Sequence, residues 1–145
     1  MYKHILIATD GSELAAKAIE AGLTLAKLMG SKVTAAVVTE PWTAIAPGEI
    51  AMAFPAEEYM KGATDHANKV LASVTEAAKT KGVNCEICHV KDRYPADGII
   101  EAAKERGCDL IVMASHGRRG VSRLLLGSQA NQVVIHSEVP VLICK

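Results

Sequence analysis

One segment of the chain, residues 113–129, combines glycines and arginines between an apolar run and a helical pattern. It reads Met-Ala-Ser-His-Gly-Arg-Arg-Gly-Val-Ser-Arg-Leu-Leu-Leu-Gly-Ser-Gln. Gly117 and Gly120 permit a positive φ and a close approach of the backbone to a ligand. Residues 127–129, Gly-Ser-Gln, would present backbone N–H groups at a helix start, where the helix dipole favours an anion. These features predict a phosphate-binding loop.

Three arginines add positive charge to this segment: Arg118, Arg119 and Arg123. The whole chain is neutral, with 16 Lys plus Arg against 16 Asp plus Glu, so it has no overall field that would draw nucleic acid or an anionic membrane. A phosphate ligand must therefore be held locally, by charge-assisted contacts. The spacing alone leaves open a solvated loop before a helix that an N-terminal serine caps.

No catalytic set is evident in the segment. His116 lies within it, but a general base needs an orienting partner and a nucleophile within reach, and the sequence shows neither. The chain has no G-x-x-x-x-G-K-[ST] pattern, and no G-x-G-x-x-G follows its first apolar run. We therefore expect no catalytic residue and no cage of protein ligands for a metal.

A second polar segment, Ala8-Thr9-Asp10-Gly11-Ser12, follows the first apolar run. Asp10 and Glu13 have the spacing of a capping box for the first helix. One carboxylate oxygen of Asp10 can serve as the cap while the other meets a ligand. The sequence therefore predicts two roles for Asp10.

The elements that must position these residues alternate along the chain. Apolar runs predict five strands, at residues 4–8, 33–38, 83–90, 110–114 and 139–144. Helical spacing separates them, which favours a parallel sheet with helices on both faces. The predicted helices are 15–29 with Gly30 as its C-cap, Pro55 to Lys81, Pro95 to Arg106, and one from Gly127 or Ser128 that ends before Pro140. Small residues on the first helix, such as Gly22, would let it lie close to the sheet.

Two further features have more than one interpretation. The segment Glu40 to Phe54 is predicted as one long irregular connection, either a lid over a ligand or a packed surface loop. Cys85 and Cys88 form a C-x-x-C pattern within a predicted strand, where residues three apart point to opposite faces. This setting favours structural thiols over a redox pair or a zinc site.

Ligands of open parallel sheets bind outside the carboxyl ends of the strands, near the point where the winding direction reverses. The segments after the first and fourth strands are the two candidates for this ligand site. If these two strands are neighbours, the two segments converge, so that one holds a nucleoside and the other its phosphates.

The motifs Ile-Leu-Ile-Ala-Thr-Asp-Gly-Ser, Ser-His-Gly-Arg-Arg-Gly with Leu-Leu-Leu-Gly-Ser, and Val-Pro-Val-Leu-Ile-Cys cover both ends of the chain. Together they resemble the universal stress protein family over essentially the whole length. The resemblance implies an α/β fold, Rossmann-like and similar to the adenine nucleotide alpha hydrolases, with an open five-stranded parallel sheet in the order 3-2-1-4-5. It also implies a dimer.

The resemblance further implies ATP binding through a G-x2-G-x9-G-[ST] pattern, which corresponds here to Ala114, Gly117, Gly127 and Ser128. Thr9 and Asp10 would lie beside the nucleoside, and Val38 would contact adenine. The nucleotide-binding residues that we expect are Thr9, Asp10, Val38, Met113, Ala114, Gly117, Arg118, Gly127, Ser128 and Gln129. Mg²⁺ would be held by Asp10 through waters and the ATP phosphates.

The 145 residues predict a single domain, residues 1–145, and the N-terminal sequence predicts a cytoplasmic location. The resemblance implies that this domain acts as an ATP-binding regulatory or stress-response factor. The last strand should lie at the sheet edge and pair with a second copy, giving a homodimer. Neither nucleic acid nor membrane is an expected partner. One alternative is a dimeric interaction module without nucleotide, suggested by alanine at position 114. Another is a slow ATP hydrolase, and a flavodoxin-like electron carrier is disfavoured by the few aromatic residues.

Overall fold

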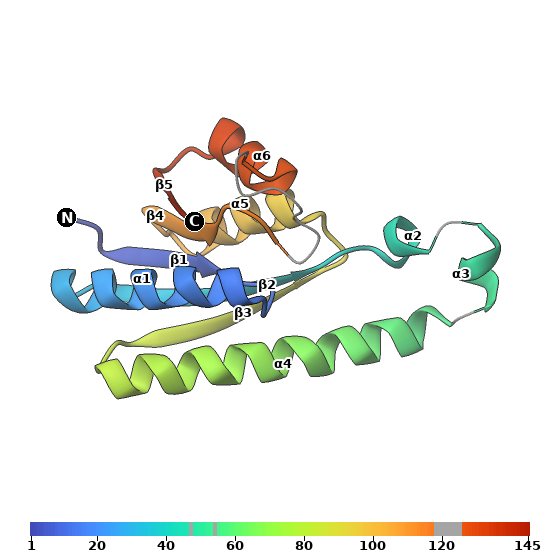
Figure 1. Cartoon of the computed structure of the whole chain (residues 1–145), viewed down its shortest axis with the longest axis horizontal. Coiled ribbons are helices and arrows are strands. Elements are labelled where there is room, and N and C mark those ends of the chain that lie inside the picture. Colours follow the sequence, from blue (N-terminus) through green and yellow to red (C-terminus); the bar gives the residue numbers. More distant parts are fainter. Residues whose placement is uncertain (47, 54, 118–125) are drawn as a thin grey trace.

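The computed structural model describes residues 1–46, 48–53, 55–117 and 126–145. Strands and helices alternate along most of the chain (Figure 1), as the hydrophobic pattern predicts. The strands are β1 (His4–Ala8), β2 (Lys32–Thr39), β3 (Cys85–Lys91), β4 (Leu110–Ala114) and β5 (Val141–Cys144). The helices are α1 (Glu13–Met29), α2 (Trp42–Ile45), α3 (Glu49–Ala53), α4 (Ala56–Lys81), α5 (Pro95–Glu105) and α6 (Ser128–His136).

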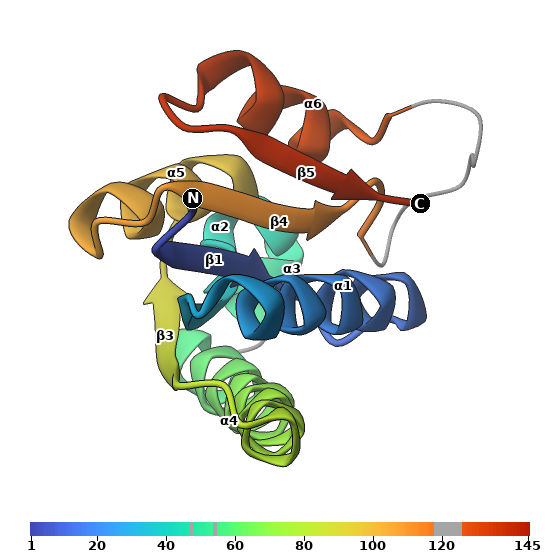
Figure 2. The ribbon, with the colours of Figure 1, turned by 90° about the vertical axis from the view of Figure 1, so that its left-hand side faces the viewer.

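The strands form one parallel sheet in the order β3-β2-β1-β4-β5, which confirms the predicted order. β1 pairs with both β2 and β4, so the winding direction reverses at β1. Helices α1 and α4 cover one face of the sheet, and α5 and α6 cover the other (Figure 2). Both faces of the central strands are therefore buried.

Alternating side chains of the central strands enter two different cores. Leu6 and Ile111 pack in the core beneath α5 and α6, whereas Ile5, Ile7 and Val112 pack in the core beneath α1. Each of these five side chains is fully buried. This alternation explains why β1 and β4 read as continuous apolar runs rather than as alternating patterns.

Gly22 confirms that small residues bring α1 close to the sheet. A Cβ atom at this position would lie 2.6 Å from Cδ1 of Ile7. The helix ends as predicted at Gly30, whose φ of 69° is a left-handed conformation that glycine adopts without strain. Gly82 ends α4 in the same way, with a φ of 72°.

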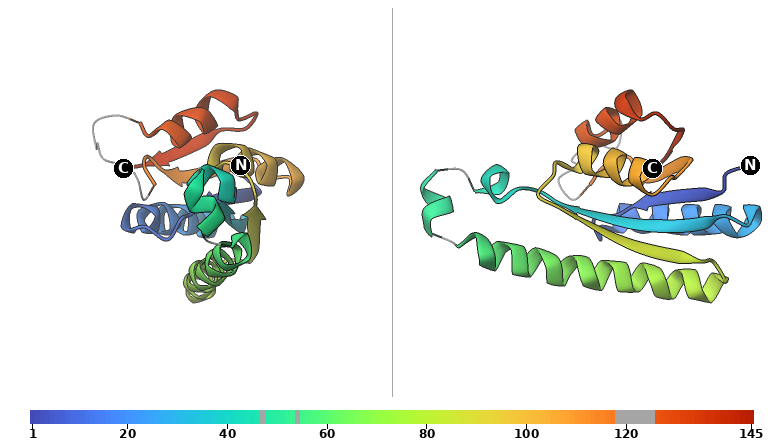
Figure 3. Two further views of the ribbon diagram at one scale, coloured as in Figure 1. Left: turned by 90° about the vertical axis from the view of Figure 1, so that its right-hand side faces the viewer. Right: turned by 180° about the vertical axis from the view of Figure 1, so that it is seen from behind.

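The segment from Glu40 to Phe54 differs from its prediction, because it contains the short helices α2 and α3. Together with the first turns of α4, these helices extend beyond the end of the sheet, and we call them the arm (Figures 1 and 3). The Trp42 and Tyr59 rings pack with their centroids 5.0 Å apart, and the Tyr59 hydroxyl donates a hydrogen bond to the Glu40 carbonyl over 2.8 Å. Side chains distant in sequence thus hold the arm, which local sequence patterns cannot reveal.

The two cysteines of the C-x-x-C pattern point to opposite faces of β3, as predicted. Cys85 packs against the cores on the side of α1 and α4, whereas Cys88 packs against the core beneath α5 and α6. Burial raises the pKa of the Cys85 thiol. A raised pKa disfavours the thiolate that redox chemistry and metal binding require.

None of the helices in the described parts of the chain combines the length and the apolar character needed to cross a membrane.

His4 gives the fold a testable dependence on pH. Its side chain is buried, and its Nε2 lies 2.8 Å from Thr34 Oγ1. Burial, and then the charge of Lys32, lower the pKa of His4 below the ordinary value of 6.5. The unfolded chain therefore binds a proton more readily than the folded one, and stability falls as the pH falls below that ordinary value.

We expect the free energy of unfolding, measured with urea between about pH 8 and pH 5, to decline at the acidic end. His4→Gln keeps a polar side chain but cannot titrate, so its decline should be shallower. His89 is the internal comparison, because burial also lowers its pKa, and His89→Gln should remove a separate part of the decline. An unchanged profile in His4→Gln would exclude His4 as a source.

Candidate functional site

A cavity of about 960 Å³ opens at the carboxyl ends of the strands. Its floor comes from the ends of β1, β2 and β4, and its walls come from the starts of α5 and α6 and from the arm. Because β1 and β4 are neighbours, the segments that follow them converge here. This is the edge and the reversal point at which open parallel sheets bind ligands.

Every predicted ligand residue except Arg118 lines the cavity. Arg118 lies outside the described residues, as do Arg119, Gly120 and Arg123. The predicted residues that line the cavity are Thr9, Asp10, Val38, Met113, Ala114, Gly117, Gly127, Ser128 and Gln129. They come from three separate parts of the chain. The structure thus places them around one space, as the topology predicts.

Backbone-to-side-chain hydrogen bonds shape the segment after β1. Thr9 Oγ1 accepts from the Gly11 N–H over 3.2 Å, and Asp10 Oδ1 accepts from the Ser12 N–H over 2.9 Å. Gly11 has a φ of 82°, which turns the chain sharply before α1. These bonds fix the position of the Asp10 carboxylate at the cavity wall.

The predicted capping role of Asp10 is wrong. Ser12 is the N-cap of α1, and its Oγ accepts from the Ala15 N–H over 3.1 Å. The turn at Gly11 places Asp10 too early in the chain to reach the first turn of the helix. Its carboxylate therefore orders the turn and faces the cavity instead.

Gly117 lies against Asp10, which joins the two predicted segments. A Cβ atom on Gly117 would be 2.9 Å from Asp10 Oδ2. Gly117 is not among the described glycines with a positive φ, so the expected backbone freedom is not what glycine supplies here. It supplies the close approach to the carboxylate.

Ala114 occupies a regular strand position. It is the last residue of β4, pairs with Cys144 of β5 and is buried in the core beneath α1. A residue in this setting has an extended backbone that alanine adopts without strain. The methyl group in place of the first motif glycine therefore causes no local conflict.

The start of α6 differs in one respect from its prediction. Gly127 is the N-cap, and its N–H donates to the Ser115 carbonyl over 2.9 Å, so it is not available to a ligand. Ser128 is the first helical residue, and within the described parts of the chain no side chain caps this end. The helix dipole at Ser128 and Gln129 still directs partial positive charge into the cavity.

Gln129 has an additional contact that sequence patterns did not indicate. Its Oε1 accepts a hydrogen bond from the backbone N–H of Ala96 over 3.0 Å. Ala96 lies in the first turn of α5, so this side chain satisfies one N–H group of a neighbouring helix. Gln129 therefore fixes the starts of α5 and α6 relative to each other.

Sequence reasoning missed the outer wall of the cavity. This wall includes Tyr59 and His66 from α4 and Tyr94 from the start of α5. His66 Nε2 lies 3.3 Å from the Asp10 carbonyl oxygen, so α4 reaches the segment after β1. Only the topology of the sheet could have indicated these residues. In a parallel sheet, the segments that follow β2 and β3 lie at the same edge as the segment after β1.

His116 also lines the cavity, with its Nδ1 3.0 Å from Ser115 Oγ. Within the described residues, no three His, Cys, Asp or Glu side chains gather into a metal-binding group. Among the residues that the structure describes, no acidic partner is recorded for this serine and histidine, and an acidic partner is the orienting group of a catalytic triad.

Comparison with known proteins matches the profile of the Universal stress protein family to residues 1–145. The chain belongs to the universal stress protein family. A universal stress protein of Thermus aquaticus is 34% identical over 145 residues, which is all of both chains. The resemblance of the end motifs to this family is thereby confirmed.

Solved structures of universal stress proteins share the fold. The universal stress protein UspA from Lactobacillus plantarum superposes with a TM-score of 0.87 at 23% identity, covering 99% of this chain and 98% of that one. A universal stress protein from Archaeoglobus fulgidus, solved in complex with dAMP, gives a TM-score of 0.70 at 22% identity, covering 99% and 98%. The family fold therefore contains this sheet order and its helices.

Proposed function

We propose that this universal stress protein binds ATP in the cavity and acts as a dimeric regulatory or stress-response factor. The observation that carries the proposal is the convergence of the Asp10 segment, Gly117 and the start of α6 around one cavity at the carboxyl ends of the strands. The dAMP complex of the Archaeoglobus fulgidus protein supports the same ligand class. Cytoplasmic action and the extent of the single domain stay predictions.

The two ends of the cavity suit the two ends of a nucleotide. At one end, the first residues of α6 offer backbone N–H groups and the Ser128 hydroxyl to phosphates. Thr9, Asp10 and Val38 line the cavity at the ends of β1 and β2, where a ribose and a base would lie. Arg118 is proposed as a phosphate contact from its sequence position alone.

A magnesium ion fits this site only as a companion of the phosphates. Mg²⁺ prefers oxygen ligands and retains several waters, so one carboxylate together with phosphate oxygens suffices. Asp10 is the carboxylate that lines the cavity beside Gly117, and it would hold the ion there. Such an ion neutralises phosphate charge.

The alternative of an interaction module without nucleotide rested on alanine at position 114. Ala114 is a buried strand residue, so alanine in place of the first motif glycine does not strain the backbone. For a slow ATP hydrolase, Asp10, His66 and His116 line the cavity as groups able to position a water, and no contact among the described residues singles one of them out for that role. Nucleotide binding is therefore the function that we put forward.

We propose dimerisation through β5, because this strand is the outer strand beside β4. Leu142 of β5 is 41% exposed, and Val134 and Ile135 on α6 are 45% and 60% exposed. An outer strand with unpaired backbone and apolar side chains is a ready surface for a symmetric copy.

Native mass spectrometry of freshly purified protein tests both parts of the proposal. We expect a species of twice the 15.3 kDa chain mass that carries up to two adenine nucleotides. Leu142→Glu should shift the protein to the single-chain mass, since it puts a charge on the apolar edge. The Ile87→Glu variant is the matched control, because Ile87 is a comparably exposed residue of the opposite outer strand, β3.

The dimer and the nucleotide site would be contradicted by different results. A single-chain mass for the original protein at micromolar concentration would contradict the dimer and leave the nucleotide site untouched. Absence of a retained nucleotide, together with no mass shift on adding ATP, would contradict nucleotide binding.

A further inference from the structure

The cavity extends from the carboxyl ends of the strands to the arm. Its wall at this end includes Ala44 and Ile45 of α2, Tyr59 and Gly62 of α4, and Tyr94 beside α5. We call this part the arm end. Nothing in the proposed contacts to ribose and phosphate uses these residues.

The strand order sets the direction in which a nucleotide would lie. Helix α6 follows β4, whereas Glu40 follows β2 on the other side of β1. A nucleotide with its phosphates at the start of α6 therefore directs its base across β1 toward β2. The outer edge of the base then faces the arm end.

Gly62 is the glycine of α4 that lines the arm end. It lies in the first third of the 26-residue helix α4, where glycine is unfavourable because of its backbone freedom. Its φ is not positive, and a Cβ atom placed on it would meet nothing within 4 Å. The fold thus gives no steric reason for glycine here, although Gly62 is one of the residues that line the cavity.

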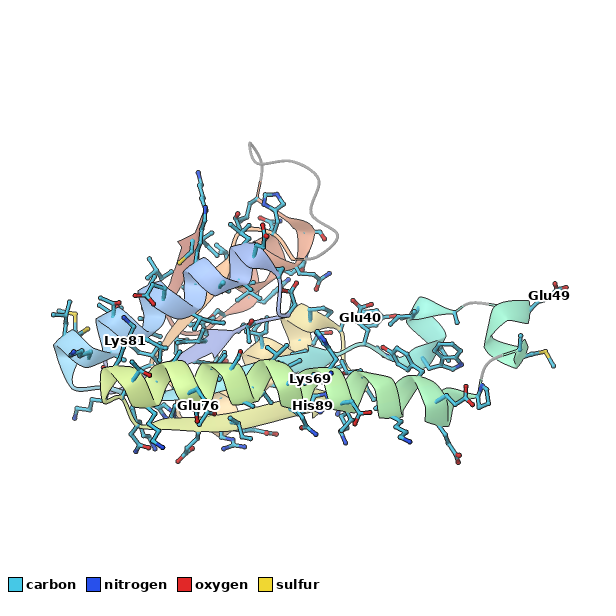
Figure 4. All side chains as sticks on the ribbon, turned by 60° about the horizontal axis from the view of Figure 1, so that its bottom comes forward. Glu40, Glu49, Lys69, Glu76, Lys81 and His89 are labelled. Carbon is cyan, nitrogen blue, oxygen red and sulfur yellow. The ribbon has the colours of Figure 1, made fainter. Side chains whose placement is uncertain are left out.

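Side-chain contacts hold the wall of the arm end in position. The Tyr59 ring packs against Trp42, and its hydroxyl donates to the Glu40 carbonyl, which fixes α4 to the chain that leaves β2. Figure 4 shows Glu40 where the arm joins the sheet. The Tyr59 side chain therefore presents a positioned aromatic surface to the cavity.

Carboxyl groups and apolar surfaces share the arm end. Glu40 and Glu58 line this part of the cavity, and its described lining includes no lysine or arginine. The aromatic and aliphatic surfaces of Tyr59, Tyr94 and Ile45 suit an apolar group instead. An apolar group with no negative charge matches both properties.

From these observations we infer that the arm end is a subsite for an aromatic or aliphatic substituent on the base of an adenine nucleotide. This inference rests on the proposed function, because the nucleotide determines where the substituent lies. The ligand class is then a base-modified adenine nucleotide, with the substituent on the exocyclic amine at the outer edge of the ring. Gly62 is the residue that determines this specificity.

Calorimetric titration with ATP and with N6-benzyl-ATP tests the subsite. We expect the original protein to bind the benzyl derivative at least tenfold more tightly than ATP, because the benzyl group is buried at the arm end. Gly62→Leu should weaken binding of the derivative at least tenfold while leaving the affinity for ATP within about twofold. Ala72→Leu, at an exposed site of α4 outside the cavity, is the matched control and should change neither affinity.

The outcomes separate this inference from the function on which it rests. If ATP binds but the benzyl derivative binds more weakly in the original protein, the subsite is refuted and the nucleotide site stands. If Gly62→Leu weakens both ligands equally, Gly62 faces the nucleotide itself and the subsite is again refuted. If neither ligand binds, the proposed function fails and the subsite fails with it.

Discussion

Gly127→Ala is expected to lower the free energy of unfolding by about 1–3 kcal/mol, the usual cost of forcing an extra methyl group into a packed site. The methyl carbon would lie 2.7 Å from the Ser115 carbonyl oxygen and 3.3 Å from His116 Cδ2. That carbonyl accepts the Gly127 N–H, so the backbone cannot move away without losing the hydrogen bond. The φ of Gly127 is −60°, which excludes backbone strain as the cause.

Gly62→Ala is the matched control, since the same methyl group is added to a glycine whose surroundings are open. It should raise the free energy of unfolding by about 0.5–1 kcal/mol, because alanine is the better residue within a helix. Urea unfolding of both variants without ligand measures the difference. Equal changes of the same sign would mean that the contact between residues 115 and 127 does not restrain the start of α6.

The strands were predictable because the central strands are buried on both faces, whereas the order of the strands in the sheet followed from the resemblance to the family. Such strands have unbroken apolar sequences, and β1 and β4 coincide with their predicted bounds at residues 4–8 and 110–114. The last strand is shorter than predicted and begins at Val141, since Pro140 has no N–H group for a ladder. Prediction worked where a local run of apolar residues was the signal.

Convergence of Asp10 and Gly117 was predictable for a different reason. It follows from the position of the two segments at the carboxyl ends of neighbouring strands, without knowledge of side-chain geometry. The conformations themselves were not predictable. Asp10 holds the turn before Ser12 rather than capping α1, and the Gly127 N–H turns to Ser115, because both depend on contacts across a loop.

The outer wall of the cavity had the weakest sequence signal. Tyr59 approaches the end of β2 only because the first turns of α4 extend past the sheet and Tyr59 packs on Trp42. This contact links residues 17 positions apart through two short helices that lack a strong periodic pattern. A ligand contact from α4, such as His66, becomes visible only when the arm is placed in space.

ATP at about a hundred times its dissociation constant is expected to stabilise the protein by roughly 2.7 kcal/mol, because it binds the folded state alone. Ser128→Glu should remove most of this gain, since a carboxylate at the first residue of α6 repels phosphates. If affinity falls a hundredfold, the same ATP concentration leaves a gain of only about 0.4 kcal/mol. Thermal or urea unfolding with and without ATP measures both values.

Without ATP, the effect of Ser128→Glu should have the opposite sign. A negative charge in the first turn of a helix interacts favourably with the dipole, by about 0.3–1 kcal/mol at low salt. The Ser128 side chain is exposed and does not cap α6, so its replacement removes no internal contact. The variant should therefore be as stable as the original protein, or more so, while it loses the response to ATP.

Ser128→Gln separates charge from size in this experiment. Glutamine has the shape of glutamate without its charge, so this variant should retain most of the gain from ATP. Raising the salt concentration should reduce the difference between the two variants, because ions screen the repulsion between carboxylate and phosphate. Equal gains from ATP in all three proteins would place the phosphates elsewhere, and equal losses in both variants would mean that bulk, rather than charge, obstructs the ligand.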